Sequence, residues 1–222
     1  YHIASLLFKN RRIVYLVTAQ LLLLLPFFVY MRQVRYYAPS AFFSLVLLYL
    51  FVKAWRCEWG KRELLLLFLS STFLFLTNYF VWAGSIAFLG LFFLWQRNKT
   101  GVITVGLTGI LPVLWYLTVH PFAGNPADAY QRQMNSVVQF FRYFPYIHTY
   151  LFPFFFIPLL FLNKRPPIII YVLGGLLLIK LVLYALLLDS HGRYLVDMMP
   201  VFVLLFGFLY TSLDTAKTRI LI

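Results

Sequence analysis

The chain has 222 residues, of which 63% are hydrophobic and only 11% charged, and its formal net charge is +13. Soluble domains are typically about 45–50% apolar and about 25% charged, so this composition indicates a polytopic membrane protein and excludes a disordered chain. The basic residues are dispersed between apolar runs, which is typical of membrane topology signals and argues against a nucleic-acid partner. The single cysteine, Cys57, excludes an internal disulfide, and no spacing of Cys and His indicates a metal site.

Apolar segments follow one another along the whole chain, each bounded by charged residues, Pro or Gly. They cover residues 13–31, 38–53, 63–77, 79–95, 101–119, 147–162, 167–188 and 195–212. We therefore predict an all-α protein, a polytopic bundle of about eight transmembrane helices that forms a single transmembrane domain over residues 1–222. The third and fourth segments together exceed one ordinary span, so Thr77-Asn78-Tyr79 predicts a tight hairpin. One long tilted helix is the alternative.

The distribution of lysine and arginine predicts the orientation. If the N-terminus of the chain is cytoplasmic and every segment crosses, each inner loop carries at least two basic residues, as the positive-inside rule expects. We therefore predict a multi-pass protein of the cell membrane with both ends of this chain in the cytoplasm. The outer loops then contain arginine but no lysine, and arginine suits bidentate contacts with phosphate or carboxylate. The outer arginines are Arg32, Arg35, Arg132, Arg142 and Arg193.

The one long loop, residues 120–146, is expected to be external. From about Ala127 it becomes amphipathic, and its apolar positions recur at spacings of three and four. This spacing predicts a helix that lies along the outer membrane surface, either as a packing element or as a gate for a substrate. The apolar positions are Tyr130, Met134, Val137, Val138 and Phe141. For Arg132 and Arg142, on the same stretch, we favour contact with lipid headgroups.

Two outer turns carry polar residues that apolar surroundings do not explain. Arg32 and Arg35 are three residues apart, so on a continuing helix they share a face that can hold a phosphate or pyrophosphate. Anchoring to lipid headgroups beside an aromatic belt is an equally open interpretation. The second turn is Thr77-Asn78-Tyr79, for which a plain turn is the alternative.

A third outer feature is the densest polar cluster of the chain, in the stretch DSHGRYLVDMMP. Its polar residues are Asp189, His191, Arg193, Tyr194 and Asp197. Capping of the following helix would explain Asp189, but it does not account for His191 and Arg193 together.

Lys180 is a cation within an apolar segment. It precedes Asp189 by nine residues and so lies about 13 Å deeper on a helix. Burial of an ammonium in hydrocarbon costs roughly 2.5–3.5 kcal/mol, which makes Lys180 a functional candidate. Snorkelling toward the cytoplasmic side is the alternative. Because the other features lie at the outer ends of several segments, we predict one outward-facing site suited to a lipid-linked phosphate.

Three stretches, taken in order, resemble a known family. The first is LLLLLPFFVYMRQVRYYAPSAFF with Pro26 and Arg35-Tyr36-Tyr37, the second is the hairpin LFLTNYFVWAG, and the third is HGRYLVDMMP with Arg193, Tyr194 and Pro200. Together they are similar to motifs of membrane glycosyltransferases with the GT-C fold. The closer likeness is to the protein O-mannosyltransferase and aminoarabinose transferase group. The ordered set extends over most of the chain.

The resemblance implies an enzyme that transfers a hexose or pentose from a polyprenyl-phosphate donor to a protein, lipid or glycan of the cell envelope, with inversion, on the periplasmic or other extracytoplasmic side. The departing phosphate requires cations nearby, for which Arg35 and Arg193 are the first choices and Lys180 the third. The resemblance assigns no cofactor and no metal ligand to this chain, and it leaves room for a divalent metal in the full-length enzyme. The residues expected to bind the donor are Arg32, Arg35, Tyr37, Asn78, Tyr79, Lys180, His191, Arg193 and Tyr194.

The family pattern also predicts what this stretch does not contain. The catalytic acid of the family lies in a first outer loop that precedes the matched region, so we expect it upstream of Tyr1, in a longer protein of which this is the C-terminal part. Gln33 and Val34 stand where an acidic residue often precedes the R-x-Y element. The main rival is a transporter or flippase of a lipid-linked glycan, and a purely structural membrane subunit is the third possibility. Transporters usually contain internal repeats or broken helices in matching halves, and neither is evident in the sequence.

Overall fold

The structure is a computed structural model that describes residues 1–24, 27, 29, 37–56, 59–119, 141, 167–187 and 192–220. Over these residues the regular structure is helical throughout and contains no strand, which confirms the all-α prediction. The predicted apolar segment 147–162 lies outside the described residues. So does the predicted surface helix of the 120–146 loop, apart from Phe141.

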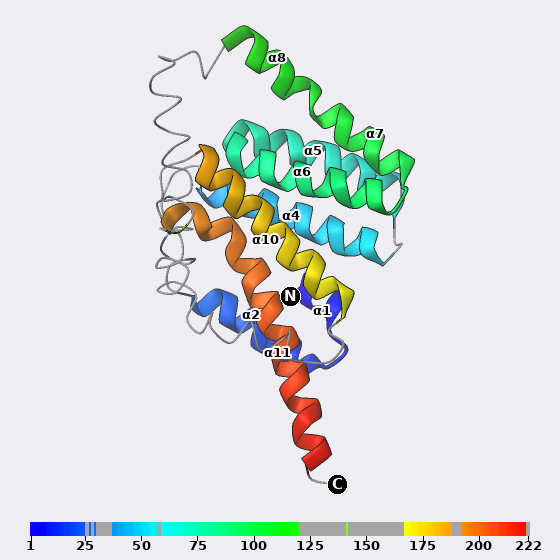
Figure 1. The fold of residues 1–222 in the computed structure, drawn as a ribbon, viewed down its shortest axis with the longest axis vertical. Helices are drawn as coiled ribbons and strands as arrows, with labels where there is room; N and C mark the ends of the chain where they lie inside the picture. Colours follow the sequence, from blue (N-terminus) through cyan, green and yellow to red (C-terminus); the bar gives the residue numbers. More distant parts are fainter. Residues whose placement is uncertain are drawn as a thin grey trace.

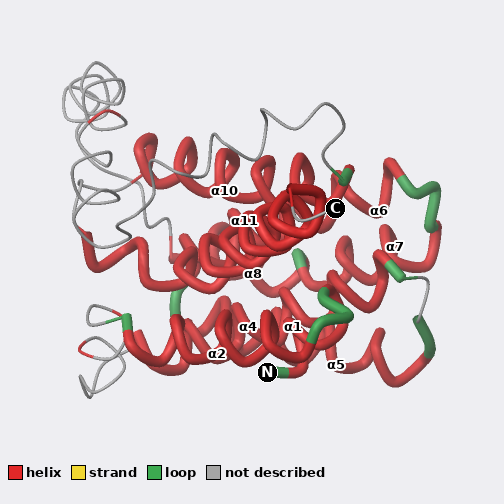
Figure 2. The backbone as a smooth tube through the Cα atoms, turned by 90° about the horizontal axis from the view of Figure 1, so that it is seen from below, coloured by secondary structure: helices red, strands yellow, loops and turns green. Residues whose placement is uncertain are grey.

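The described chain forms a stack of helices (Figure 1). α7 and α8 lie at one end of the stack beside α5 and α6, α4 and α10 form the middle, and α1, α2 and α11 form the other end. Seen from below, α2, α4 and α10 run in roughly the same direction across the view, with α11 between α10 and the other two (Figure 2). The elements are α1 (His2–Leu7), α2 (Arg11–Leu23), α4 (Tyr37–Trp55), α5 (Lys61–Thr77), α6 (Tyr79–Trp95), α7 (Lys99–Thr108), α8 (Ile110–Val119), α10 (Ile168–Leu187), the 3-10 helix η2 (Gly192–Met198) and α11 (Met199–Ile220).

The hairpin between α5 and α6 confirms the prediction at Asn78. The backbone of Asn78 is extended, with φ −159° and ψ 94°, and its side-chain Oδ1 accepts a hydrogen bond of 3.2 Å from the Val81 N–H. Asparagine is a strong helix N-cap because its side chain satisfies an N–H that lacks a partner within the helix. Asn10 and Asn98 cap α2 and α7 in the same way.

The predicted segment 101–119 is two helices, because the backbone turns at Gly109. Pro112 lies one turn after Thr108 and has no N–H to donate to the Thr108 carbonyl, so a continuous helix would lose a hydrogen bond there. The short helix α1 was not predicted from the sequence.

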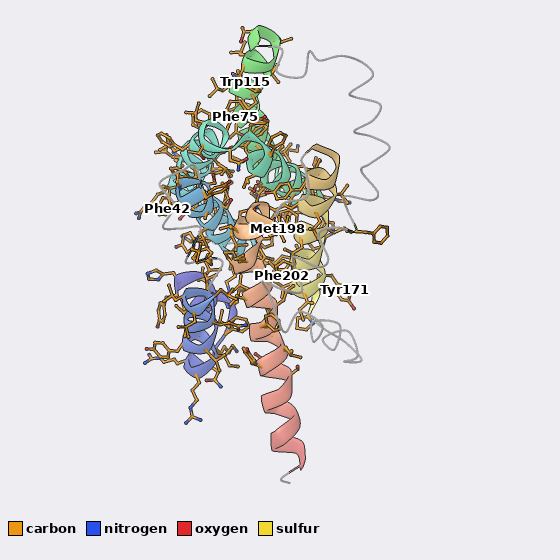
Figure 3. All side chains as sticks on the ribbon, turned by 90° about the vertical axis from the view of Figure 1, so that its left-hand side faces the viewer. Phe42, Phe75, Trp115, Tyr171, Met198 and Phe202 are labelled. Carbon is orange, nitrogen blue, oxygen red and sulfur yellow. The ribbon has the colours of Figure 1, made fainter. Side chains whose placement is uncertain are left out.

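η2 and the first half of α11 form the centre of the molecule (Figure 3). Every residue from Leu195 to Gly207 is buried, and Phe202 and Phe206 are among the largest fully buried side chains of the described residues. α11 packs against α2 and α10, and its C-terminal end projects beyond the other helices (Figures 1 and 3). The turn from η2 into α11 therefore positions whatever polar groups it carries deep inside the helix stack.

The outer helices expose large apolar side chains. On α5, α7 and α8, Leu65, Leu76, Ile103, Leu107 and Leu114 each have between 49% and 65% of their surface exposed. Among the described helices, Tyr37–Trp55 and Leu195–Ser212 are long and apolar enough to cross a membrane, and three further apolar helices are shorter. The predicted total of about eight spans stays a prediction.

Candidate functional site

An ion pair between Lys180 of α10 and Asp197 of η2 lies within the helical core. The distance from Lys180 Nζ to Asp197 Oδ2 is 2.5 Å, and both side chains are only 4% exposed. Removing such charges from water costs several kcal/mol per ion, which the attraction between them offsets only when further hydrogen bonds complete the pair. The surroundings of Asp197 are therefore decisive.

The two charged residues meet because they lie at the same depth. Lys180 precedes the last residue of α10, Leu187, by seven positions, or about 10 Å along an α-helix. Asp197 follows the first residue of η2, Gly192, by five positions, or about 10 Å along a 3-10 helix. Since α10 and η2 contact each other, matched depths bring the ammonium to the carboxylate.

A tyrosine completes one side of the carboxylate. Tyr184 lies one turn after Lys180 on the same face of α10, and its hydroxyl donates a hydrogen bond of 3.0 Å to Asp197 Oδ2. Oδ2 therefore receives both the ammonium and the phenol. The other oxygen, Asp197 Oδ1, is buried and has no hydrogen-bond partner among the described residues. One end of a buried carboxylate is thus available to a further donor.

Two small cavities share Asp197 as a wall. The first, which we call the outer cavity because it lies at the helix ends, has a volume of about 10 Å³. It is found where Tyr37, at the start of α4, and Asn78, in the α5–α6 hairpin, approach Asp197. Ser40, Ala41, Val81 and Val196 complete its lining.

The inner cavity has a volume of about 20 Å³ and is lined by Ser44, Ser85, Lys180 and Asp197 together with apolar side chains. Ser44 Oγ, like Asp197 Oδ1, is buried without a hydrogen-bond partner in the part of the chain that the structure describes. A single water occupies at least about 10–15 Å³ by this measure, so each cavity has the size of one small polar group.

Close packing of α6 against α10 encloses the ion pair. A Cβ atom added at Gly84 of α6 would lie 3.0 Å from Lys180 Cγ and 3.6 Å from Lys180 Cα. Glycine at this position lets the stem of Lys180 run along the backbone of α6, the kind of small-residue contact that allows helices to approach closely in membranes. At Gly174 and Gly175 of α10 an added Cβ would meet no neighbouring element within 4 Å among the described residues, so these glycines do not serve this contact.

The structure brings some of the predicted donor-binding residues together. Tyr37 and Asn78 line the outer cavity, and Lys180 reaches the same region through Asp197. Tyr79 packs instead against Trp115 of α8, with ring centroids 5.3 Å apart.

The remaining predicted residues have less structural description. Arg32, Arg35 and His191 lie outside the described residues. Arg193 and Tyr194 belong to the first turn of η2, where the backbone alone is described. Snorkelling of Lys180 was the wrong alternative, because its ammonium is bound to Asp197 and is only 4% exposed. Its predicted contact with donor phosphate stays a prediction.

Sequence reasoning singled out Lys180 and Asp197 separately but did not pair them, and it left Asp197 out of the predicted site. The signal that could have paired them is their equal distance from the turn between the two apolar segments. Tyr184 and Ser44 were missed because Tyr and Ser are common in apolar helices, so their types alone carry no indication of a site.

The comparisons with known proteins add no assignment. No family model, no curated protein and no solved structure matches the chain. Within the described residues, no group of three or more His, Cys, Asp or Glu side chains is placed to hold a metal ion.

The geometry of the site therefore has to indicate what Asp197 can bind. The carboxylate of Asp197 is fixed from one side by a cation and a phenol, its second oxygen has no hydrogen-bond partner among the described residues, and the residue lines two cavities. A group fixed in this way can accept a hydrogen bond from a hydroxyl, an amine or a water without moving.

Proposed function

We propose that this protein is an integral membrane glycosyltransferase that takes a sugar from a polyprenyl-phosphate donor and delivers it to a lipid, glycan or protein acceptor on the extracytoplasmic side. The ordered motifs around Arg35, Asn78 and Arg193 support this proposal, and so do the apolar side chains on the outside of the helix stack.

One observation carries the proposal: the three motifs converge. Tyr37 comes from the R-x-Y element, Asn78 from the hairpin and Asp197 from HGRYLVDMMP, and all three line the outer cavity. Separate anchoring features would have no reason to meet around one cavity. A binding site assembled from several helix ends would require it.

The arginines of the motifs fit a role in holding phosphate. Arg35 precedes Tyr37, which lines the outer cavity, by two residues in the sequence. Arg193 lies in the first turn of η2, which contacts both α4 and α10. Cations from these two motifs would stabilise the negative charge that develops on phosphate as the sugar leaves it.

The apolar surface fits a lipid-linked donor. Soluble monomers rarely expose wide contiguous apolar surface, whereas α5, α7 and α8 expose leucine, isoleucine and phenylalanine along their length. A polyprenyl chain would remain in the bilayer beside such helices while its phosphate reaches the helix ends near the outer cavity.

A transporter or flippase of a lipid-linked glycan is the second candidate, and the buried Lys180–Asp197 pair favours it. Ionisable residues within membrane helices commonly mark substrate or proton pathways. The outer cavity at this pair, however, lies at the start of α4 and at the α5–α6 hairpin, where Tyr37 and Asn78 are found, so it is placed at one set of helix ends.

The test is made with the protein in lipid nanodiscs and, in parallel, in sealed vesicles. Binding of undecaprenyl phosphate is measured by native mass spectrometry, and transfer of radiolabelled sugar from undecaprenyl-phosphate mannose is measured in membranes that contain the full-length protein. We expect Arg193→Ala to weaken lipid binding about tenfold or more and to abolish transfer, since a charge-assisted contact is lost. Arg142→Ala, which removes an outer arginine that we assign to lipid headgroups, is the matched control.

Two results would overturn the proposal. One is binding of undecaprenyl phosphate no tighter than that of a bilayer phospholipid with a phosphate headgroup. The other is movement of the labelled lipid across the vesicle bilayer that Arg193→Ala abolishes while transfer stays absent in every preparation, which would identify the transporter.

A further inference from the structure

Asp197 carries an oxygen atom whose environment is incomplete. The side chain is 4% exposed, Oδ2 accepts from both Lys180 and Tyr184, and Oδ1 has no partner in the described part of the chain. Buried polar atoms are nearly always hydrogen-bonded, and hydrogen bonds to charged groups are stronger than neutral ones. An unpartnered carboxylate oxygen at this depth therefore indicates a place for a hydrogen-bond donor.

The cavities bordering Asp197 limit what that donor can be. The outer cavity, at about 10 Å³, admits one hydroxyl group or one water, whereas a sugar ring or a phosphate is far larger. A phosphate is further excluded because its negative charge would lie against the carboxylate. Apolar walls from Ala41, Val81 and Val196 disfavour a second charge. A neutral hydroxyl at the edge of a larger ligand satisfies all of these limits.

We infer that Asp197 Oδ1 accepts a hydrogen bond from one hydroxyl group of the sugar carried by the lipid donor, which enters the outer cavity between Tyr37 and Asn78. The inference rests on the proposed function and names the sugar-recognising residue of that site. Asn78 offers its side-chain amide nitrogen to the ligand as a hydrogen-bond donor, because its side-chain oxygen already accepts from the Val81 N–H and so caps α6.

Lys180 and Tyr184 act as positioning residues in this arrangement. They hold the carboxylate through Oδ2, so that Asp197 is already fixed in the wall of the cavity and loses little side-chain freedom when the ligand arrives. A pre-organised acceptor of this kind discriminates strongly, because a ligand that lacks the hydroxyl leaves a buried polar atom unpaired.

The test compares two probes, undecaprenyl phosphate and undecaprenyl-phosphate mannose, together with forms of the second probe in which each sugar hydroxyl in turn is replaced by hydrogen. Dissociation constants are measured in nanodiscs with the full-length protein. We expect mannose to increase the affinity about tenfold or more over the bare lipid, and one deoxy form to lose that increase.

The protein variants assign the effect to Asp197. Because Asp197 alone cannot be replaced without stranding the charge of Lys180, the variant is Lys180→Met/Asp197→Val. We expect it to lose the sugar-dependent increase, so that it binds the mannosyl lipid no tighter than it binds the bare lipid. Ala41→Val, which fills the outer cavity and keeps the ion pair, is expected to give the same loss. Ser44→Ala, in the neighbouring inner cavity, is the matched control and should retain the sugar-dependent increase.

The outcomes separate the inference from the function on which it rests. Absence of bare-lipid binding by the wild type overturns the proposed function and the inference with it. Bare-lipid binding without a sugar-dependent increase overturns the inference alone and leaves Oδ1 as a site for water. An increase that survives in both Lys180→Met/Asp197→Val and Ala41→Val also overturns it, since the sugar is then recognised elsewhere. Should the double variant fail to fold, the result from Ala41→Val decides.

Discussion

Two lysine–carboxylate pairs of similar length lie in very different surroundings within the described part of the chain. Lys53, in the last turn of α4, lies 2.6 Å from Glu63 in the first turn of α5, and these side chains are 20% and 14% exposed. Lys180 and Asp197 are 2.5 Å apart and 4% exposed. The chemistry of the partners is the same, so the difference between the pairs is a difference of environment.

The pair at the end of the helices has alternatives that the buried pair lacks. The second oxygen of Glu63 accepts a hydrogen bond of 3.1 Å from the Gly60 N–H, so this carboxylate also starts a helix. Water can replace either partner there. In the core, nothing replaces Lys180 or Asp197 if its partner is removed, because a charge without a partner in a low-dielectric interior is strongly unfavourable. The length of a salt bridge therefore does not by itself indicate its contribution to stability; its exposure to water must also be known.

Breaking the buried pair should have the largest effect. Asp197→Val leaves the Lys180 ammonium without its anion, and we expect the free energy of unfolding to fall by about 3–5 kcal/mol. The measurement is reversible unfolding in mixed detergent micelles. Adding Lys180→Met should restore most of the loss, since two apolar side chains of similar size replace two charges. A double variant less stable than Asp197→Val alone would contradict this account.

A change that leaves both charges in place tests the packing around the pair. In Gly84→Ala the new Cβ would lie 3.0 Å from Lys180 Cγ, so α6 and α10 must move apart. We expect a loss of about 1–3 kcal/mol in the same unfolding measurement. Gly174→Ala on α10 meets no atom within 4 Å and is the matched control. Equal effects of the two substitutions would show that contact with Lys180 is not the cause.

Removal of the phenolic hydroxyl should have a smaller effect. Tyr184→Phe deletes the donor that lies 3.0 Å from Asp197 Oδ2 and keeps the ring and the ion pair. We expect a loss of about 1 kcal/mol, typical of one intramolecular hydrogen bond. Tyr15→Phe, at an exposed position on α2, should change nothing measurable. In the Lys180→Met/Asp197→Val background, the effect of Tyr184→Phe should disappear, and its persistence there would assign the hydroxyl to another partner.

The smallest effect is expected at the partly exposed pair, Lys53 and Glu63. Lys53→Met should lower stability less than any of the buried substitutions, and 1 M salt should reduce the difference from the wild type further.

This pair should also respond to pH. The hydrogen bond from Lys53 holds the pKa of Glu63 below its ordinary value of 4.5. The contribution of the pair is therefore fully present above that value and is lost as the pH falls through the lower pKa of the folded protein. Lys53→Met should flatten this acid dependence, and an unchanged acid profile would exclude the pair as its source.

Several parts of the fold could be predicted from local sequence. Asn78 between two apolar runs predicted the hairpin correctly because a side chain that caps a helix acts within four residues. The division at Gly109 was not predicted, although Pro112 is visible in the sequence. The free-energy cost of a proline within a helix depends on whether the surrounding helices hold the chain straight or allow it to turn.

The candidate site shows the same division. Tyr37 and Asn78 were predicted and line one cavity, whereas Tyr79, next to Asn78, turns toward Trp115. Asn78 has an extended backbone and Tyr79 is the first residue of α6, so the two side chains leave the chain in different directions. A motif therefore predicts which segment lies near a site, and the local backbone decides which of its side chains enters the site.

The sequence by itself determined the helical class, the succession of apolar segments, the hairpin and the anomaly of a lysine within an apolar run, because each of these follows from composition or from contacts within one helical turn. Only the tertiary structure decided that Lys180 is bound to Asp197, that Tyr184 shares the same carboxylate oxygen, and that Asp197 lines a cavity with Tyr37 and Asn78. These facts depend on the depth and rotation of α4, α6, α10 and η2 relative to one another. Packing between helices sets those quantities, and small residues such as Gly84 control how closely the helices approach.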